Sequence, residues 1–554
     1  MKKTCPISGR EFEWRKKDLE FYERMGVPVP DIHPDEMLRK LMAMRNEWKL
    51  YRRKCDKTGD TIISAYHENT PFPVYKNEIW WGDSWDGVEY GQDFDKTKSF
   101  FEQFVTLRNK VPREGTSVFK SENCDYNGHT RECKNCYLMG LAVGNEDCYY
   151  AYWVVGNKDI IDCRLVNHSE LCYECINCDT CFDCVMLQEG MNCNECYFSY
   201  QLRGCDHCIG CSNLANKSYY VFNKSVTKEE FKKKKKEILD GSYKTWEHGM
   251  KYFHDMWDKA LHRYVHSLKC ENCEGDVLFN SKNCFHSFEV IDGEDCAYNV
   301  SAGNAKDVYN SHSAGWPKCE LVYGGSVTRG GTDIRMCYYT WFCNDITYCD
   351  SCVSCKHCFG CVGLKHKEYC LFNKQYSKKE YEVLRDEIIE HMKSTHGSES
   401  GAGPEWGTIP FEMSTFGYNE TAANDYFPLT KEEALKMGFA WYDDPTSEPN
   451  ITPIEIPDSI HDTNDSICDQ PILCPITKRP YKIQKGELKF YRKMNLPIPR
   501  LSPEGRREKR TWRINPYQLF ERECSVCKKN VLSSFSKDRS EKIGCEKCYL
   551  GSAS

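Results

Sequence analysis

The cysteines near the C-terminal end of the chain have the spacing of a metal site. Cys524-x-x-Cys527 is followed by seventeen residues and then by Cys545-x-x-Cys548. Two such pairs supply four thiolates in tetrahedral geometry, the arrangement of closed structural Zn2+ sites. The surrounding module is too small to build a large core, so the metal would contribute directly to its folding. We therefore predict a structural Zn2+ ion held by Cys524, Cys527, Cys545 and Cys548.

A basic segment lies directly before these cysteines, beside the aromatic residue Trp512. Basic side chains next to an aromatic ring are typical of surfaces that contact nucleic acid. The same pattern fits the solvated face of a surface helix, so both interpretations stay open. The candidate nucleic-acid contacts are Arg506, Arg507, Lys509, Arg510 and Arg513.

The two ends of the chain are copies of one module at a constant offset of 469 residues. Cys5-Pro6-Ile7-Ser8 matches Cys474-Pro475-Ile476-Thr477, and Phe21-Tyr22 matches Phe490-Tyr491. The N-terminal copy keeps one of the four predicted zinc ligands, because the matching positions are Cys55, Thr58, Lys76 and Ile79. We expect apolar packing to replace the metal there, and the nearby aromatic residues are a source of it. They are Trp80, Trp81, Trp85, Tyr90 and Phe94.

Most of the 36 cysteines lie between these modules, in two blocks with a 12-residue period. Every ladder position holds a Cys, Val, Ile or Tyr, and an Asn or Asp often precedes it. The first ladder is Cys124, Cys136, Cys148, Ile160, Cys172, Cys184, Cys196, Cys208 and Tyr220. The second is Cys284, Cys296 and Val308, then a two-residue insertion, then Val322, Ile334, Ile346, Cys358 and Cys370.

A short period with one small inward residue per turn predicts a chain wound into parallel coils. A 12-residue coil encloses a narrow interior that Cys, Val and Ile fit. Asn and Asp suit the corners. Thr227-x-x-Glu230 and Ser377-x-x-Glu380 are capping boxes, so a helix should follow each block and cover its end. The predicted fold is mainly β and multidomain, with two parallel β-solenoid blocks and capping helices, flanked by a degenerate and an intact zinc ribbon.

The competing interpretation of these blocks is a string of zinc knuckles, because Cys-x-x-Cys pairs are frequent. The pairs keep the 12-residue phase and do not group neatly into fours, so we favour core packing. If the blocks hold metal, the first is favoured, because three pairs there fall on successive coils. These pairs are Cys181/Cys184, Cys193/Cys196 and Cys205/Cys208.

The predicted domain organisation follows from these repeats and from two linkers. Gly and Ser are frequent from Ser394 to Pro404, and residues 443–470 are acidic and proline-containing, so both segments should lack stable structure. The predicted domains are 1–113 (degenerate zinc ribbon), 114–226 (solenoid block 1), 227–269 (helical connector), 270–376 (solenoid block 2), 377–442 (capping helix and extension), 443–470 (linker) and 471–554 (zinc ribbon).

The composition is ordinary for a water-soluble protein, with a net charge of −7. The first residues contain no apolar signal segment, and no stretch reaches the ~18 apolar residues of a membrane span. We therefore expect a cytoplasmic protein with reduced thiols and no membrane partner.

These features together resemble an uncharacterised, cysteine-rich, zinc-ribbon-flanked β-solenoid family of small-genome uncultivated bacteria. The matching segments are Trp80-Trp81-Gly82-Asp83-Ser84-Trp85-Asp86, Gly360-Cys361-Val362-Gly363-Leu364, Leu371-Phe372-Asn373-Lys374, Glu405-Trp406-Gly407 and Tyr418-Asn419-Glu420-Thr421. Members are sometimes filed as CaiB/BaiF-type CoA transferases. That fold needs alternating strands and helices and a catalytic aspartate loop, and neither pattern is present here. The resemblance implies an architecture and no activity.

Three functions fit these observations. We favour a non-enzymatic zinc-binding scaffold or interaction protein with a protein partner, because no nucleophile–base motif or phosphate loop is present. The alternative is a nucleic-acid or ribosome-associated factor that acts through the basic C-terminal module. A carbohydrate-active β-helix enzyme is the third, but twelve-residue coils leave little room for a catalytic cleft.

Overall fold

The computed structural model describes residues 1–395, 404–445 and 451–552, and strands outweigh helices in it. It divides into two compact units. Unit 1 comprises Met1–Thr116, Val265–Asp443 and Pro516–Leu519, and unit 2 comprises Ser117–Tyr264, Asp444–Asn515 and Phe520–Ser554. Each unit thus combines one terminal module with one cysteine-rich block, and the two parts are far apart in the sequence.

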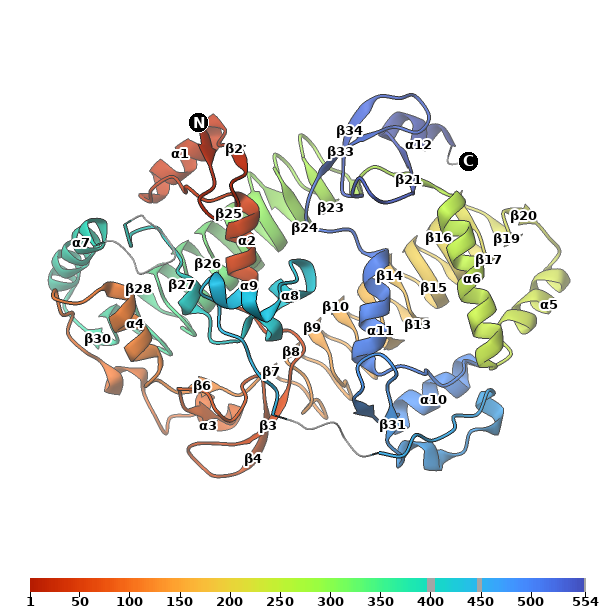
Figure 1. Ribbon diagram of the computed structural model, residues 1–554, viewed down its shortest axis with the longest axis horizontal. Helices are drawn as coiled ribbons and strands as arrows, with labels where there is room; N and C mark the ends of the chain where they lie inside the picture. The colour runs from red at the N-terminus through yellow and green to blue at the C-terminus, as the bar shows by residue number, and fades with distance from the viewer. Residues whose placement is uncertain (396–403, 446–450, 553–554) are drawn as a thin grey trace. The chain divides into compact units, whose positions relative to one another are not determined.

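Unit 2 contains a 14-stranded sheet whose strands pair in parallel except at its last strand (Figure 1). The strands are β7 Ser117–Phe119, β8 His129–Arg131, β9 Gly140–Val143, β10 Tyr152–Val155, β11 Lys158–Ile161, β12 Arg164–Asn167, β13 Glu170–Tyr173, β14 Ile176–Asp179, β15 Phe182–Met191, β16 Asn194–Arg203, β17 Asp206–Ile209, β18 Ser212–Ala215, β19 Ser218–Val221 and β20 Lys224–Ser225.

The register of this sheet follows the predicted period. Ile160 pairs with Cys172 and Cys172 with Cys184, so each ladder position lies beside the next one twelve residues away. The Asn and Asp residues that precede ladder positions adopt left-handed backbone angles, with φ of 53° at Asn135 and 54° at Asp147. Asn and Asp tolerate this region better than most residues do, which explains their recurrence at these turns.

Unit 1 contains a nine-stranded sheet with the same register, and its last strand also pairs antiparallel. His312 pairs with Ser326, a step of fourteen residues, which places the predicted two-residue insertion at the register shift between Gly315 and Cys319. The strands are β22 Ser267–Leu268, β23 Gly275–Phe279, β24 Ser287–Glu294, β25 Ala297–Tyr323, β26 Ser326–Arg335, β27 Tyr338–Thr347, β28 Lys356–Phe359, β29 Glu368–Leu371 and β30 Lys374–Gln375.

The ladder cysteines form the interior of both blocks. Those of unit 2 pack in one buried cluster with residues such as Val154 and Leu187, and those of unit 1 pack with residues such as Val322 and Ile334. Their thiols also donate hydrogen bonds to the backbone. The Cys172 thiol lies 3.5 Å from the carbonyl oxygen of Glu170, so this buried group has a partner.

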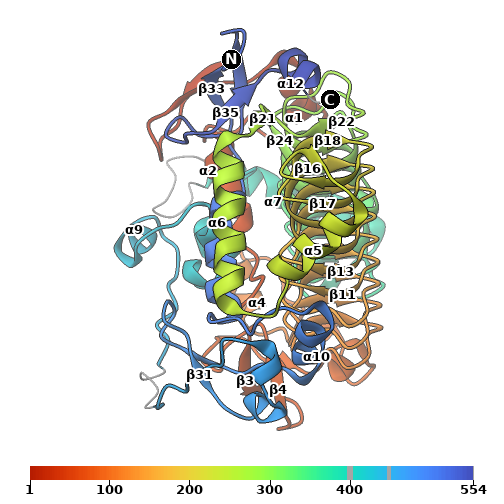
Figure 2. The same cartoon turned by 90° about the vertical axis from the view of Figure 1, so that its right-hand side faces the viewer.

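Both predicted capping helices are present. α5 (Lys228–Ile238) begins after Thr227 and α7 (Lys378–Ser394) begins after Ser377, each with the capping box formed. α5 packs on β17 and β19, near the end of the unit 2 sheet, and α6 (Tyr243–Lys259) lies against β16 (Figure 2). In unit 1, α7 packs on β29. α5 and α7 thus pack next to the end of each sheet, but the edge strands β20 and β30 themselves stay exposed, so the helices do not cover the edge as expected.

The terminal modules repeat element by element. In unit 1 the order is β1 Lys2–Thr4, β2 Glu11–Glu13, α1 Lys16–Met25, α2 Pro34–Met42, β3 Tyr51–Lys54, β4 Thr61–Ser64, β5 Val74–Tyr75 and α3 Asn77–Trp81. In unit 2 it is β31 Ile472–Leu473, β32 Pro480–Tyr481, α10 Lys485–Met494, α11 Pro503–Arg510, β33 Phe520–Glu523, β34 Asn530–Ser533, β35 Lys542–Gly544 and α12 Glu546–Ser552. Helices α1 and α10 begin and end at equivalent residues, which confirms the offset of 469.

Shorter elements complete the two units. In unit 1 these are η1 Gly87–Tyr90, α4 Phe100–Arg108, β6 Arg113–Glu114, η2 Phe411–Met413, η3 Tyr418–Glu420, α8 Ala422–Tyr426 and α9 Lys431–Lys436. In unit 2 they are β21 Leu261–Arg263, η4 Ile460–Asp462, η5 Asp465–Cys468 and η6 Thr511–Arg513. Trp80 and Trp85 are buried in unit 1, as expected for an apolar core in place of metal.

The predicted linkers need one correction. Most of the Gly/Ser-rich segment, residues 396–403, lies outside the described residues, as do residues 446–450. Within the acidic segment, however, η4 and η5 are folded, and Ser459 bridges to Ser242. The expectation of no stable structure is therefore wrong for residues 459–468, because buried Ile460 and Ile467 anchor them. In the described part of the chain, none of the helices has both the length and the apolar character needed to cross a bilayer.

Candidate metal centre and cation-lined cavity

The four C-terminal cysteines come together as predicted. The Sγ atoms of Cys524, Cys527, Cys545 and Cys548 all lie within 4.8 Å of one another, and those of Cys527 and Cys545 are 3.7 Å apart. Tetrahedral coordination with metal–sulfur bonds of about 2.3 Å requires sulfur atoms roughly 3.8 Å apart. The site therefore has the dimensions and the donor set to hold a metal ion. Cys524 and Cys545 are buried, whereas Cys527 is exposed.

The backbone around Cys524 explains how the first pair is positioned. The Cys524 N–H donates to the Lys529 carbonyl at 2.9 Å, and the Lys528 N–H donates back to the Cys524 carbonyl at 2.9 Å. Lys528 has a φ of 65°, so the chain reverses and turns Cys527 toward Cys524. We call this arrangement a knuckle turn. The Cys545 N–H also donates to the Cys524 sulfur at 3.3 Å, a bond that favours a thiolate.

The knuckle turn occurs four times among the described residues. Cys5, Cys55 and Cys474 each make the same pair of backbone hydrogen bonds, to Arg10 and Gly9, to Asp60 and Gly59, and to Arg479 and Lys478. In these three copies a hydroxyl residue occupies the position of the second cysteine. The replacements are Ser8, Thr58 and Thr477.

Hydrogen bonds act on the cysteine sulfur in two of the altered copies, those of Cys474 and Cys55. Burial raises the pKa of the Cys474 thiol, but hydrogen bonds from Ser502 and Thr477 outweigh burial and bring that pKa to about 7. Burial likewise opposes the Thr58 hydroxyl at Cys55, whose pKa ends below its ordinary value. The Lys76 N–H donates to the Cys55 sulfur at 3.4 Å, as Cys545 does to Cys524. The turn has therefore been kept where the ligand set has not.

The ladder cysteines differ from this centre. Within the described residues, the C-terminal four are the group of metal-ligating side chains whose donor atoms converge. The pairs singled out in the first block are buried, and their thiols face backbone carbonyl groups. Cys184 donates to the Phe182 carbonyl at 3.4 Å and Cys196 to that of Asn194 at 3.4 Å.

Three of the five candidate nucleic-acid contacts are corrected by the structure. Arg506, Arg510 and Arg513 are buried at 5%, 7% and 3% exposure, because they pair with carboxylates inside unit 2. The buried Asp162 carboxylate forms ion pairs with Arg506, whose Nε lies 2.9 Å away, and with Arg510, whose Nη1 lies 3.0 Å away. Arg507 and Lys509 also lie on α11, where Lys509 is exposed and Arg507 is half-buried.

Glu174 holds the second half of this network. It pairs with Arg510 at 2.8 Å and with Arg513 at 3.4 Å. Burial raises the pKa of Glu174, although both arginines oppose that shift. Burial also lowers the pKa of Arg513 to about 10, and repulsion from Arg510 adds to the effect. The network ties α11 and η6 to β13, since removing one member would leave an unpaired charge in the interior.

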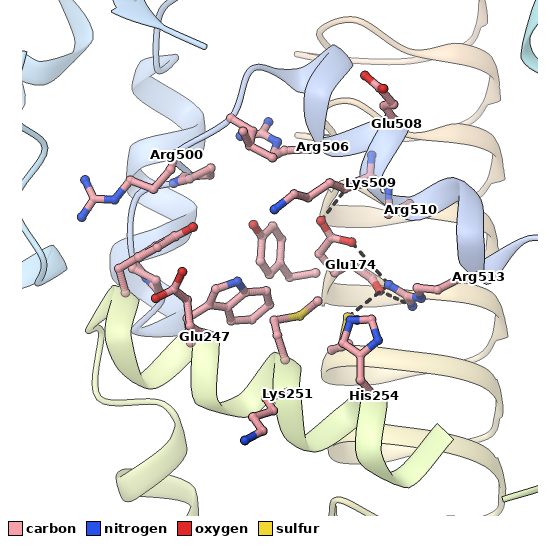
Figure 3. Close-up of a pocket in the computed structure, with 18 of the residues that line it drawn as sticks. Glu174, Glu247, Lys251, His254, Arg500, Arg506, Glu508, Lys509, Arg510 and Arg513 are labelled. Atoms are coloured by element: carbon pink, nitrogen blue, oxygen red, sulfur yellow. Dashed lines mark hydrogen bonds and ion pairs between the residues drawn. The ribbon is translucent and has the colours of Figure 1, made fainter. Parts of the chain in front are cut away.

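A cavity of about 750 Å3 lies beside this network (Figure 3). α6, α11, η6 and the segment Pro497–Leu501 surround it, and Tyr173 and Met186 contribute from the sheet. Burial lowers the pKa of His254 at its wall and so favours the neutral imidazole. The sequence feature that marks this cavity is a stripe of large residues on one face of α6, and this stripe was not predicted to form a site. They are Tyr243, Trp246, Met250 and His254.

No protein-family model matches this chain, and no curated protein matches its sequence. The function is therefore inferred from the chemistry of the cysteine centre and of the cavity.

Proposed function

We propose that this chain is a non-enzymatic scaffold or interaction protein that is built on two β-solenoids and stabilised by one structural Zn2+ ion. The observation that carries the proposal is the convergence of four thiols in one terminal module. All four positions are filled by protein ligands, so no coordination position is left for a substrate, as in structural zinc sites.

The solenoid part of the proposal is supported by register and burial. Paired parallel strands are offset by twelve residues in both units, apart from an eleven-residue step from β22 to β23 and the fourteen-residue step at His312, and the same ladder positions are buried in each. Parallel strands at a constant short offset are what a wound chain produces. Such bodies present long, regular faces, which suits the binding of another macromolecule better than catalysis.

Zinc content tests the proposal directly. Protein purified with a reductant should contain about one zinc ion per chain by elemental analysis. Cys527→Ser and Cys548→Ser should lose it, whereas Cys474→Ser, at an equivalent knuckle turn, should keep it. A zinc content near zero in the parent protein, or several ions per chain, would contradict the proposal.

Binding to nucleic acid is a second candidate, now supported by two cations rather than five. Arg507 and Lys509 lie on one helix, α11, at the surface of unit 2. Their contribution can be measured by the affinity of the protein for single-stranded nucleic acid across a salt series. A steep fall in affinity with salt, weakened in the double variant Arg507→Gln/Lys509→Gln, would favour this candidate over a protein partner.

A further inference from the structure

We propose that the cavity in unit 2 binds a small planar aromatic ligand that carries one acidic group. This goes beyond a scaffold role, because it assigns a specific small-molecule site to one unit. A volume of about 750 Å3 falls in the range of sites that enclose small organic ligands. The lining combines apolar rings with a few charged groups, which is the composition of such sites.

α6 is built with two different faces. One face packs into the core of unit 2 through Gly249, Phe253 and Trp257. The other face turns half-buried side chains toward the cavity, at the i, i+3, i+7 and i+11 spacing that aligns residues along one side of a helix. These are Tyr243, Trp246, Met250 and His254. A large apolar stripe that the protein does not bury fully is what a ligand could cover.

Aromatic surfaces line the cavity in two pairs. The rings of Trp246 and Tyr173 have centroids 5.4 Å apart, and those of Trp512 and His254 are stacked with centroids 4.3 Å apart. Trp246, Trp512 and His254 are only partly buried, so ring surface is left uncovered. Flat rings of a ligand can stack on such surfaces in offset or edge-on geometry.

Six basic side chains and three acidic ones, Glu174, Glu247 and Glu508, line the cavity, and Lys509 is the basic group that would recognise an anion. Arg506, Arg510 and Arg513 are neutralised by buried carboxylates, and Arg500 donates to the carbonyl oxygens of Ile456 and Pro457. Lys509 is exposed and points into the cavity from α11, and in the described part of the chain it has no carboxylate partner (Figure 3). An ammonium group placed beside apolar rings favours a ligand with an acid at the edge of its ring system.

Two ligands of nearly equal size separate the contribution of the charge from that of the rings. 2-Naphthoate carries a carboxylate, and 2-naphthamide replaces it with a neutral amide. Isothermal titration of the full-length, zinc-loaded protein should show 2-naphthoate binding at least about tenfold more tightly. In Lys509→Met this preference should disappear, while Lys489→Met, an exposed lysine on α10 outside the cavity, should keep it.

A second variant protects the test against misfolding. Met250→Trp fills the cavity from α6 and should abolish binding of both ligands, while zinc content and circular dichroism stay those of the parent protein. Equal affinity for the two ligands, equal effects of Lys509→Met and Lys489→Met, or unchanged binding in Met250→Trp would each overturn the proposal. None of these results depends on the zinc content that tests the scaffold proposal.

Discussion

The hydroxyl of Tyr150 donates a hydrogen bond of 2.8 Å to the carboxylate of Glu487, and this contact joins the cysteine-rich block of unit 2 to its terminal module. Unit 1 repeats it, because Tyr298 donates to Asp18 at 2.9 Å. Glu487 and Asp18 are equivalent residues of the duplicated modules. The duplication therefore includes the contact between the terminal module and the cysteine-rich block, in addition to the module and the block themselves.

This contact should stabilise unit 2 measurably. Tyr150→Phe removes the donor to a buried carboxylate, and such hydrogen bonds contribute about 1.5–3 kcal/mol. We expect the free energy of unfolding, measured by chemical denaturation, to fall by that amount. Tyr126→Phe, at a tyrosine that is 40% exposed, should change it by less than about 0.5 kcal/mol. If the two variants lost the same free energy of unfolding, Tyr150 would not contribute to the docking of the module on the block.

Removal of the metal should destabilise the C-terminal module. Chelation at neutral pH should lower the unfolding temperature of the parent protein, because the binding free energy of a structural metal is also folding free energy. The same chelator should have no effect on Cys548→Ser, which has already lost a ligand. Readdition of Zn2+ should restore the parent unfolding temperature, and failure to restore it would contradict a reversible structural site.

The narrow interior of the blocks should discriminate by side-chain volume. Cys184 is fully buried, and the equivalent ladder positions hold Ile160 in unit 2 and Val322 in unit 1. Cys184→Val should therefore be tolerated, with a cost below about 1.5 kcal/mol. Cys184→Phe should cost more, about 1–3 kcal/mol or above, because close-packed interiors respond to added volume with strain. Denaturation midpoints of the two variants, compared with the parent protein, measure the difference.

The pH dependence of unit 1 should report on Glu114. Burial raises its pKa to about 8 from an ordinary 4.5, although the Trp81 ring N–H and Lys365 oppose the shift. Between these values the folded protein holds a proton that the unfolded chain has released. Stability therefore falls as pH rises from about 4.5 to about 8 and levels off above and below this window.

A substitution can isolate this contribution. In the parent protein Trp81 Nε1 donates to Glu114 Oε1 at 2.6 Å. Glu114→Gln keeps an oxygen that can accept this hydrogen bond and removes the ionisable group. The variant should be more stable than the parent protein at pH 8 and equally stable at pH 4. Glu89→Gln, at an exposed carboxylate of the same module, should leave the pH profile unchanged. A parent profile that rises from pH 5 to pH 8 would contradict the assignment.

Local and periodic features could be predicted from the sequence. The capping boxes at Thr227 and Ser377 depend on four adjacent residues, and each begins a helix as expected. The ladder depends on spacing alone, so Cys172 pairs with Cys184 as the period requires. The convergence of the four C-terminal cysteines was also predicted from spacing alone. Each Cys-x-x-Cys spacing fixes one turn, and the fold then only has to bring the two turns together.

The basic segment was misinterpreted because its partners are distant in sequence. Asp162 and Glu174 are twelve residues apart and therefore lie on neighbouring turns of the block, facing Arg506, Arg510 and Arg513. No local pattern around Arg510 reports a carboxylate 336 residues away. The cavity was missed for a similar reason, since three segments of the chain build its walls. Asp162 and Glu174 each lie two residues after a ladder residue, Ile160 and Cys172. Comparing that position from one turn to the next would have brought the two carboxylates together.

The interleaved composition of the two units affects how the protein can be made. Met1–Thr116 belongs to a unit whose remaining parts begin at Val265, so this module emerges from the ribosome about 150 residues before its docking surface. At roughly 5–20 residues per second, that delay lasts about 7–30 seconds. During this interval the aromatic face around Tyr22 and Trp14 has no surface to cover it. Docking of this module on its block must therefore wait until the second block has been synthesised.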